Sequence, residues 1–108
     1  VARYVDGIAP LFSLDCLRGI GGVDMEGNPY GYGVDVALSL AAHRAGWPVV
    51  VDHQVGLKHS YHSTARRIDG FMEKAARAED AYMRRTLGPD WRDILRREQR
   101  EFTDHQRI

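Results

Sequence analysis

The stretch YGYGVDVALSLAAHRAGW, residues 30–47, decides the fold because it joins an aromatic, glycine-rich loop to an apolar helix. Small and apolar residues recur in it at spacings of three and four: Val34, Leu38, Ala41, Ala42 and Ala45. This spacing predicts a helix over residues 34–45, which Gly46 can terminate. Asp35 lies in the first turn of that helix, where a carboxylate can cap free amides, bind a ligand or act as a base.

The segments on both sides of this helix predict an α/β fold. Residues 2–12 combine β-branched and aromatic residues, which favours a strand, and Ser13 can cap a short helix over residues 14–20. Three consecutive valines in WPVVVD, residues 47–52, predict a buried strand, and residues 54–59 can form a second one. We therefore expect a short mixed sheet with packed helices, which would be classed as α+β if it stood alone.

The composition changes near residue 64, and two amphipathic helices are expected after it. The apolar stripe of the first contains Ile68, Phe71, Met72, Ala75, Ala78 and Tyr82, and that of the second contains Trp91, Ile94, Leu95 and Phe102. The segment LGPDW, residues 87–91, separates the helices, and opposite charges such as Asp80 and Arg84 recur at helical spacing. We expect two units, residues 1–64 and a helical C-terminal extension of residues 65–108.

Length and composition limit the classes of protein to which the chain can belong. Its 108 residues are 44% hydrophobic and 28% charged, which suits one small globular domain. The formal net charge is zero and no basic patch is left uncompensated, so we expect no nucleic-acid partner. No run of 18 apolar residues occurs, so we expect no transmembrane segment. The single cysteine, Cys16, cannot form an internal disulfide, which favours a buried thiol and a cytoplasmic location.

Four short motifs occur in an order that resembles a known family. They are GGVD at residues 21–24, GVD at 33–35, VVVD at 49–52 and LKH at 57–59. Together they resemble the acceptor-side, C-terminal half of family-2-like glycosyltransferases with the GT-A fold. The resemblance implies that residues 1–64 belong to the catalytic domain of a nucleotide-diphospho-sugar transferase whose donor-binding half is absent from this chain. The chain would then be a fragment, and inactive when taken alone.

The resemblance also implies roles for individual residues. Asp35 matches the second acid of a pair that opens the helix in this family, and would be the general base that takes a proton from an acceptor hydroxyl. Val34 stands where the family carries the first acid, so an acceptor contact made by that acid would differ or be lost here. His59 ends the LKH motif, where the family often has a histidine that binds the divalent metal or the diphosphate. A metal, Mn²⁺ or Mg²⁺, is therefore expected, but only together with the missing donor half.

The loop before Asp35 is the predicted substrate-binding surface. Tyr30 and Tyr32 could stack on the C–H face of a sugar ring. Gly31 and Gly33 would let the backbone approach a ligand closely. The expected partners are a nucleotide-sugar donor and a hydroxyl acceptor.

Plainer interpretations of the same residues stay open. Asp35 can be a first-turn residue that only satisfies helix amides, and the tyrosines can pack on the surface of the domain. The alternative function is a non-catalytic module in which residues 66–108 mediate self-association as a homodimer. Two apolar helix stripes need a surface to cover them, and a second copy could supply it.

Overall fold

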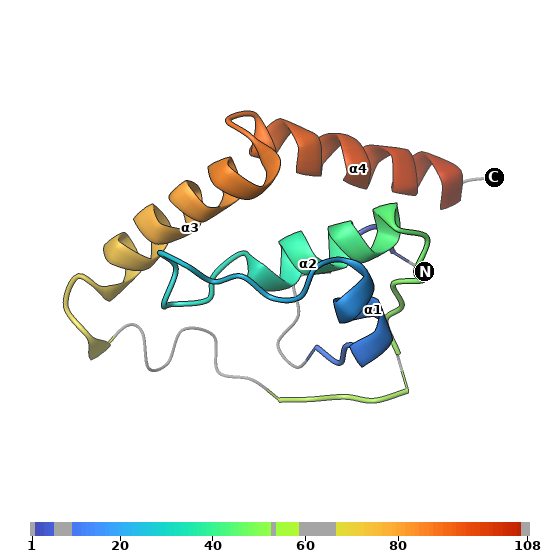
Figure 1. The fold of residues 1–108 in the computed structure, drawn as a ribbon, viewed down its shortest axis with the longest axis horizontal. Coiled ribbons are helices and arrows are strands. Elements are labelled where there is room, and N and C mark those ends of the chain that lie inside the picture. Colours follow the sequence, from blue (N-terminus) through green and yellow to red (C-terminus); the bar gives the residue numbers. More distant parts are fainter. Residues whose placement is uncertain (1, 6–9, 53, 59–66, 107–108) are drawn as a thin grey trace.

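Four helices make up most of the described structure. This is a computed structural model that describes residues 2–5, 10–52, 54–58 and 67–106, with side chains up to residue 100. In chain order the helices are α1 (Leu14–Gly19), α2 (Val34–Arg44), α3 (Phe71–Leu87) and α4 (Trp91–Gln106). Figure 1 shows α3 and α4 as a bent pair along one side of α2, with α1 on the other side.

The predicted α/β fold with a short mixed sheet is wrong. The structure is 52% helix and 2% strand, and the residues it describes form no sheet. The valine segment has one antiparallel bridge, in which the Ala2 N–H donates to the Val49 carbonyl at 2.6 Å. A strand is stabilised by a ladder of backbone partners, and one bridge does not make a ladder. The assignment to a GT-A type fold is corrected with it, since that assignment depended on the sheet.

The predicted helices are confirmed, and α1, α2 and α3 each begin for a local reason. Ser13 caps α1, because its Oγ accepts a hydrogen bond from the Cys16 N–H at 3.3 Å. The N-cap residues of α2 and α3 are Gly33 and Gly70, with φ of 82° and 71°, and no side chain caps either helix. Such left-handed backbone angles favour glycine over residues that carry a Cβ. The two glycines therefore set where these helices start.

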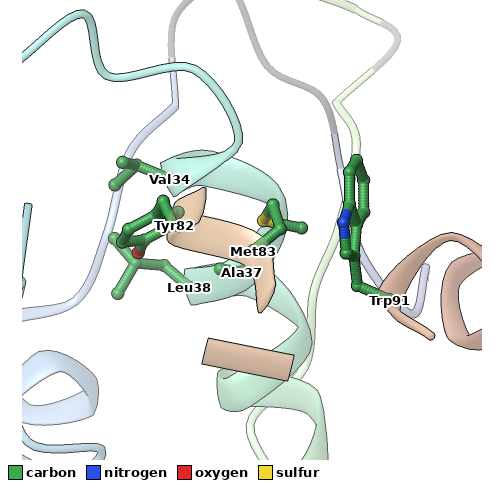
Figure 2. Packing of buried hydrophobic residues seen from close by; sticks show 6 residues of the cluster. All are labelled: Val34, Ala37, Leu38, Tyr82, Met83 and Trp91. Atoms are coloured by element: carbon green, nitrogen blue, oxygen red, sulfur yellow. The ribbon is translucent and has the colours of Figure 1, made fainter. Parts of the chain in front are cut away.

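The larger core lies between α2, α3 and α4. Its buried residues are Val34, Ala37 and Leu38 from α2, Tyr82 and Met83 from α3, and Trp91 from α4. Figure 2 shows the α2 and α3 side chains close together, with Trp91 to one side of them on α4. Burial of these apolar groups stabilises the contact between the C-terminal helices and α2. The division into residues 1–64 and 65–108 stays a prediction, but the two segments share this core.

A smaller cluster joins the N-terminal segment to α1 and α2. Its buried residues are Cys16, Ala42 and Val49, with Ala2 and Val5 packed against them. The predicted burial of Cys16 is confirmed, since its exposed fraction is 4%. The backbone N–H of Val5 also donates to the Ser39 hydroxyl at 2.9 Å. The N-terminal segment is thus fixed against the middle of α2.

The extended segment after α2 leaves apolar side chains in contact with solvent. Val50, Val51, Val55 and Leu57 are between 53% and 67% exposed, whereas Val49 is 8% exposed. One valine of the predicted buried strand is therefore buried, through its bridge to Ala2, and its neighbours are not.

Among the described helices, none combines the length and the apolar character that crossing a membrane would require.

Candidate functional site

Two consecutive turns lead the chain into α2. The Asn28 N–H donates to the Met25 carbonyl at 2.9 Å, and the Gly31 N–H donates to the Asn28 carbonyl at 3.2 Å. The Asn28 side chain is fully buried, and its Nδ2 donates to the Tyr32 carbonyl at 2.8 Å. Asparagine favours such side-chain to backbone bonds in turns. This bond spans the loop and holds the backbone shortly before Asp35.

Asp35 lies half-buried in the first turn of α2. Its Oδ1 accepts a hydrogen bond from the Val36 N–H at 2.8 Å. Gly33 is the N-cap, so the carboxylate satisfies one of the amides that a helix leaves free at its N-terminus. This contact supports the interpretation of Asp35 as an amide-satisfying residue. A carboxylate has about four acceptor positions, so the contact is also compatible with a chemical role, which stays a prediction.

Tyr30 and Tyr32 both pack against Phe71, the first residue of α3. The ring centroids of Tyr30 and Phe71 are 5.3 Å apart with an interplanar angle of 90°. Those of Tyr32 and Phe71 are 6.2 Å apart at 75°. Edge-to-face contacts of this kind are favourable because the ring edge is positive and the ring face negative. The tyrosines therefore have a packing role, and any sugar surface that they form would be held in place by α3.

Gly33 brings the backbone of the loop into close contact with α3. A Cβ atom at this position would lie 3.0 Å from the Met83 Sδ and 3.3 Å from the Glu79 Cγ. A Cβ at Gly31 would meet only the Met25 Cε, at an ordinary 3.5 Å. The lack of a side chain at Gly33 thus leaves room for Met83 and Glu79 of α3. The prediction that these two glycines admit a ligand is not tested by these contacts.

The predicted metal or diphosphate residue, His59, lies outside the described residues. In the ranges that are described, no three His, Cys, Asp or Glu residues are placed so that they could hold a metal ion. The sequence DME, residues 24–26, forms a turn, in which Asp24 Oδ1 accepts a hydrogen bond from the Glu26 N–H at 2.9 Å. The described residues alone therefore form no metal site, and we assign no chemical step to a metal ion.

Three residues that shape the loop were not singled out from the sequence as site residues. Phe71 was predicted only as part of an apolar stripe, and Met83 lies outside that stripe. Asn28, between Gly27 and Pro29, carried the composition of a turn but no indication of a buried side chain. The contacts of all three depend on how the loop, α2 and α3 pack together.

Comparison with known proteins assigns no family to the chain. No protein-family model, curated protein or solved structure matches it. The interpretation of the site therefore depends on its motifs and its geometry.

Proposed function

We propose that this chain forms the acceptor-side part of a nucleotide-sugar-dependent glycosyltransferase, with Asp35 as the general base. The observation that carries the proposal is the placement of Asp35 in the first turn of α2, directly after the loop of Tyr30 and Tyr32. A base must be held on a rigid element, because the geometry of proton transfer tolerates little movement. The Val36 amide, the Asn28 bond and the Gly33 contact supply that rigidity.

The reaction is a single displacement at the anomeric carbon of the donor sugar. The acceptor oxygen attacks this carbon and forms the new glycosidic bond, while its proton passes to an Asp35 carboxylate oxygen. The bond between the anomeric carbon and the diphosphate oxygen breaks, and the nucleoside diphosphate leaves with the electron pair.

The tyrosine loop is the proposed acceptor surface. One face of a pyranose presents C–H groups that pack favourably on an aromatic ring. Tyr30 and Tyr32 are half-buried, so part of each side chain stays accessible beside its contact with Phe71. The acceptor is therefore proposed to be a sugar or a molecule that ends in one.

Other parts of the protein would complete the active site. The exposed Val50, Val51, Val55 and Leu57 are typical of a surface that another part of the same protein covers. We propose that the missing part binds the nucleotide-sugar donor and, with His59, the diphosphate and its Mn²⁺ or Mg²⁺. The chain alone would then lack transferase activity. The buried, free Cys16 suits a cytoplasmic protein of this kind.

The alternative, a self-association module formed by residues 66–108, has less support. Tyr82 and Trp91 come from the two predicted apolar stripes, and both are buried within the chain. The stripes therefore have a surface to cover them without a second copy. Among the stripe residues whose side chains the structure describes, Ile68 and Met72, at the start of the first stripe, are the exposed ones, at 52% and 38%. We retain a homodimer as a property to measure rather than as the function.

Substitution of Asp35 in the full-length protein tests the proposal. The assay measures nucleoside diphosphate released from UDP-, GDP- and dTDP-sugars in the presence of a panel of methyl glycosides. Asp35→Asn keeps the size of the side chain and should lower the transfer rate by about 10²- to 10⁴-fold, the usual contribution of a general base. Asp15→Asn, at a carboxylate that is 81% exposed on α1, is the control and should leave the rate unchanged. An undiminished rate in Asp35→Asn, or a fall in thermal stability alone, would support the amide-satisfying role instead.

A further inference from the structure

We infer that Phe71 is a positioning residue of the proposed acceptor site, so that the first turn of α3 belongs functionally to that site. The inference rests on the proposed function, because it concerns the tyrosine surface beside Asp35. Neither the motifs nor the chain order assigns Phe71 to the site, since 39 residues separate it from Tyr32.

A single ring sets the tilt of both tyrosines. Phe71 makes an edge-to-face contact with Tyr30 at 5.3 Å and a second one with Tyr32 at 6.2 Å. The angles of 90° and 75° mean that neither tyrosine lies flat on Phe71. Removing the Phe71 ring would therefore take one ring contact from each tyrosine at once, while the loss of either tyrosine would leave the other contact in place.

The α3 helix also holds the ends of the tyrosine segment. Beside Phe71, the Tyr32 hydroxyl donates to the Met72 sulfur at 3.8 Å. Twelve residues further along α3, about 18 Å at the helical rise, Met83 lies against Gly33. The tyrosine side chains thus reach the first turn of α3, while the backbone at Gly33 lies against Met83, so α3 contacts this segment at two places.

The tilt of these rings decides where a bound acceptor would present its hydroxyl. A sugar that stacks on a ring follows the plane of that ring, so a rotated tyrosine moves the hydroxyl away from Asp35. Preorganised binding surfaces lose affinity when their side chains become mobile, because the ordering must then occur on binding. Phe71 acts through the tyrosines and touches neither the acceptor nor the donor.

Hydrogen exchange tests the positioning directly, without a substrate. The variants are Phe71→Leu, which keeps apolar bulk but removes the ring, and Phe71→Tyr, which keeps the ring. Lys74→Ala, at an exposed position one turn along α3, is the matched control. In Phe71→Leu we expect amide exchange of residues 30–36 to become about five to ten times faster, with α4 unchanged. Phe71→Tyr and Lys74→Ala should both stay within about twofold of the wild type. Unchanged exchange in Phe71→Leu, or an equal rise throughout the chain, would overturn the inference.

Transfer kinetics in the full-length protein supply the second readout. With the same nucleotide sugars and methyl glycosides, Phe71→Leu should raise the acceptor KM about fivefold and leave release of nucleoside diphosphate to water unchanged. Phe71→Tyr should restore the wild-type KM. An unchanged acceptor KM in Phe71→Leu overturns the positioning role even if Asp35→Asn abolishes transfer. Full transfer by Asp35→Asn overturns the proposed function, whatever the exchange of the loop shows.

Discussion

The indole N–H of Trp91 donates to Oδ1 of Asp80 at 3.1 Å, and this bond ties the start of α4 to the middle of α3. The same carboxylate accepts from Arg84 Nε at 2.8 Å and from an Arg92 guanidinium nitrogen at 3.1 Å. The Arg92 guanidinium also lies over the Trp91 ring, 4.1 Å from its centroid. Asp80 therefore joins the two helices, which form the bent pair in Figure 1. The predicted pairing of Asp80 with Arg84 is confirmed as one part of this network.

Loss of the indole donor should weaken the junction of α3 and α4. We expect Trp91→Phe to lower the free energy of unfolding by about 1–3 kcal/mol, because a buried ring shrinks and a hydrogen bond is lost. Urea denaturation followed by circular dichroism measures the change. Arg96→Ala is the control: its ion pair with Asp93 joins side chains that are 69% and 77% exposed, and should contribute less than about 0.5 kcal/mol. Equal losses in the free energy of unfolding would show that the Trp91 contact contributes no more than an exposed ion pair.

The Asp80 network should make stability depend on pH in the acid range. Hydrogen bonds from Arg84 and then Trp91 hold the pKa of the Asp80 carboxyl below its ordinary value. The stabilisation is thus complete above the ordinary aspartate pKa of about 4, and is lost as the pH falls through the lower pKa of the folded state. The urea concentration at the unfolding midpoint should decrease when the pH is lowered from 6 to 3, and Asp80→Asn should make this decrease smaller. An identical slope in the variant would assign the acid sensitivity to other carboxylates.

Gly33 should tolerate a side chain less well than other glycines with the same backbone angle. In Gly33→Ala, strain at φ 82° adds to a Cβ that lies 3.0 Å from the Met83 Sδ, and we expect a loss of about 1–3 kcal/mol. Gly27→Ala is the matched control, because its φ is 74° and a Cβ there meets nothing within 4 Å. The control isolates the backbone strain, expected near 1 kcal/mol. If thermal unfolding shows equal losses of stability in the two variants, the contact between the added Cβ and α3 does not contribute to the loss in Gly33→Ala.

Asn28 should be the side chain on which the conformation of the loop depends most. Asn28→Ala removes the bond from Nδ2 and leaves the Tyr32 carbonyl without its side-chain donor, which should cost about 1–3 kcal/mol. Asn28→Asp should cost more, because it places a charge at a position with 0% exposure. Asp52→Ala removes a similar bond, to the Gln54 N–H, in an exposed turn and serves as the control. Comparable losses in Asn28→Ala and Asp52→Ala would contradict a special role for the buried amide.

The prediction of helices succeeded because their signals are local. Ser13 reaches an amide three residues away, and the glycine at position 33 sets its own φ. Whether the valine segment joins a sheet could not be predicted in the same way. Val49, Val50 and Val51 have a high strand propensity, but a strand forms only when a distant segment pairs with it. Within the described residues, Ala2 alone pairs with this segment, at Val49.

The features of the candidate site likewise divide into local ones and ones that depend on contacts between distant segments. By itself the sequence determined that Asp35 follows an aromatic, glycine-rich loop and opens a helix, because residues adjacent in the chain fix that arrangement. Only the tertiary structure decided that Phe71 holds both tyrosines and that Met83 packs against Gly33. Those contacts join segments about 40 to 50 residues apart, and burial of the apolar faces of α2 and α3 brings the segments together.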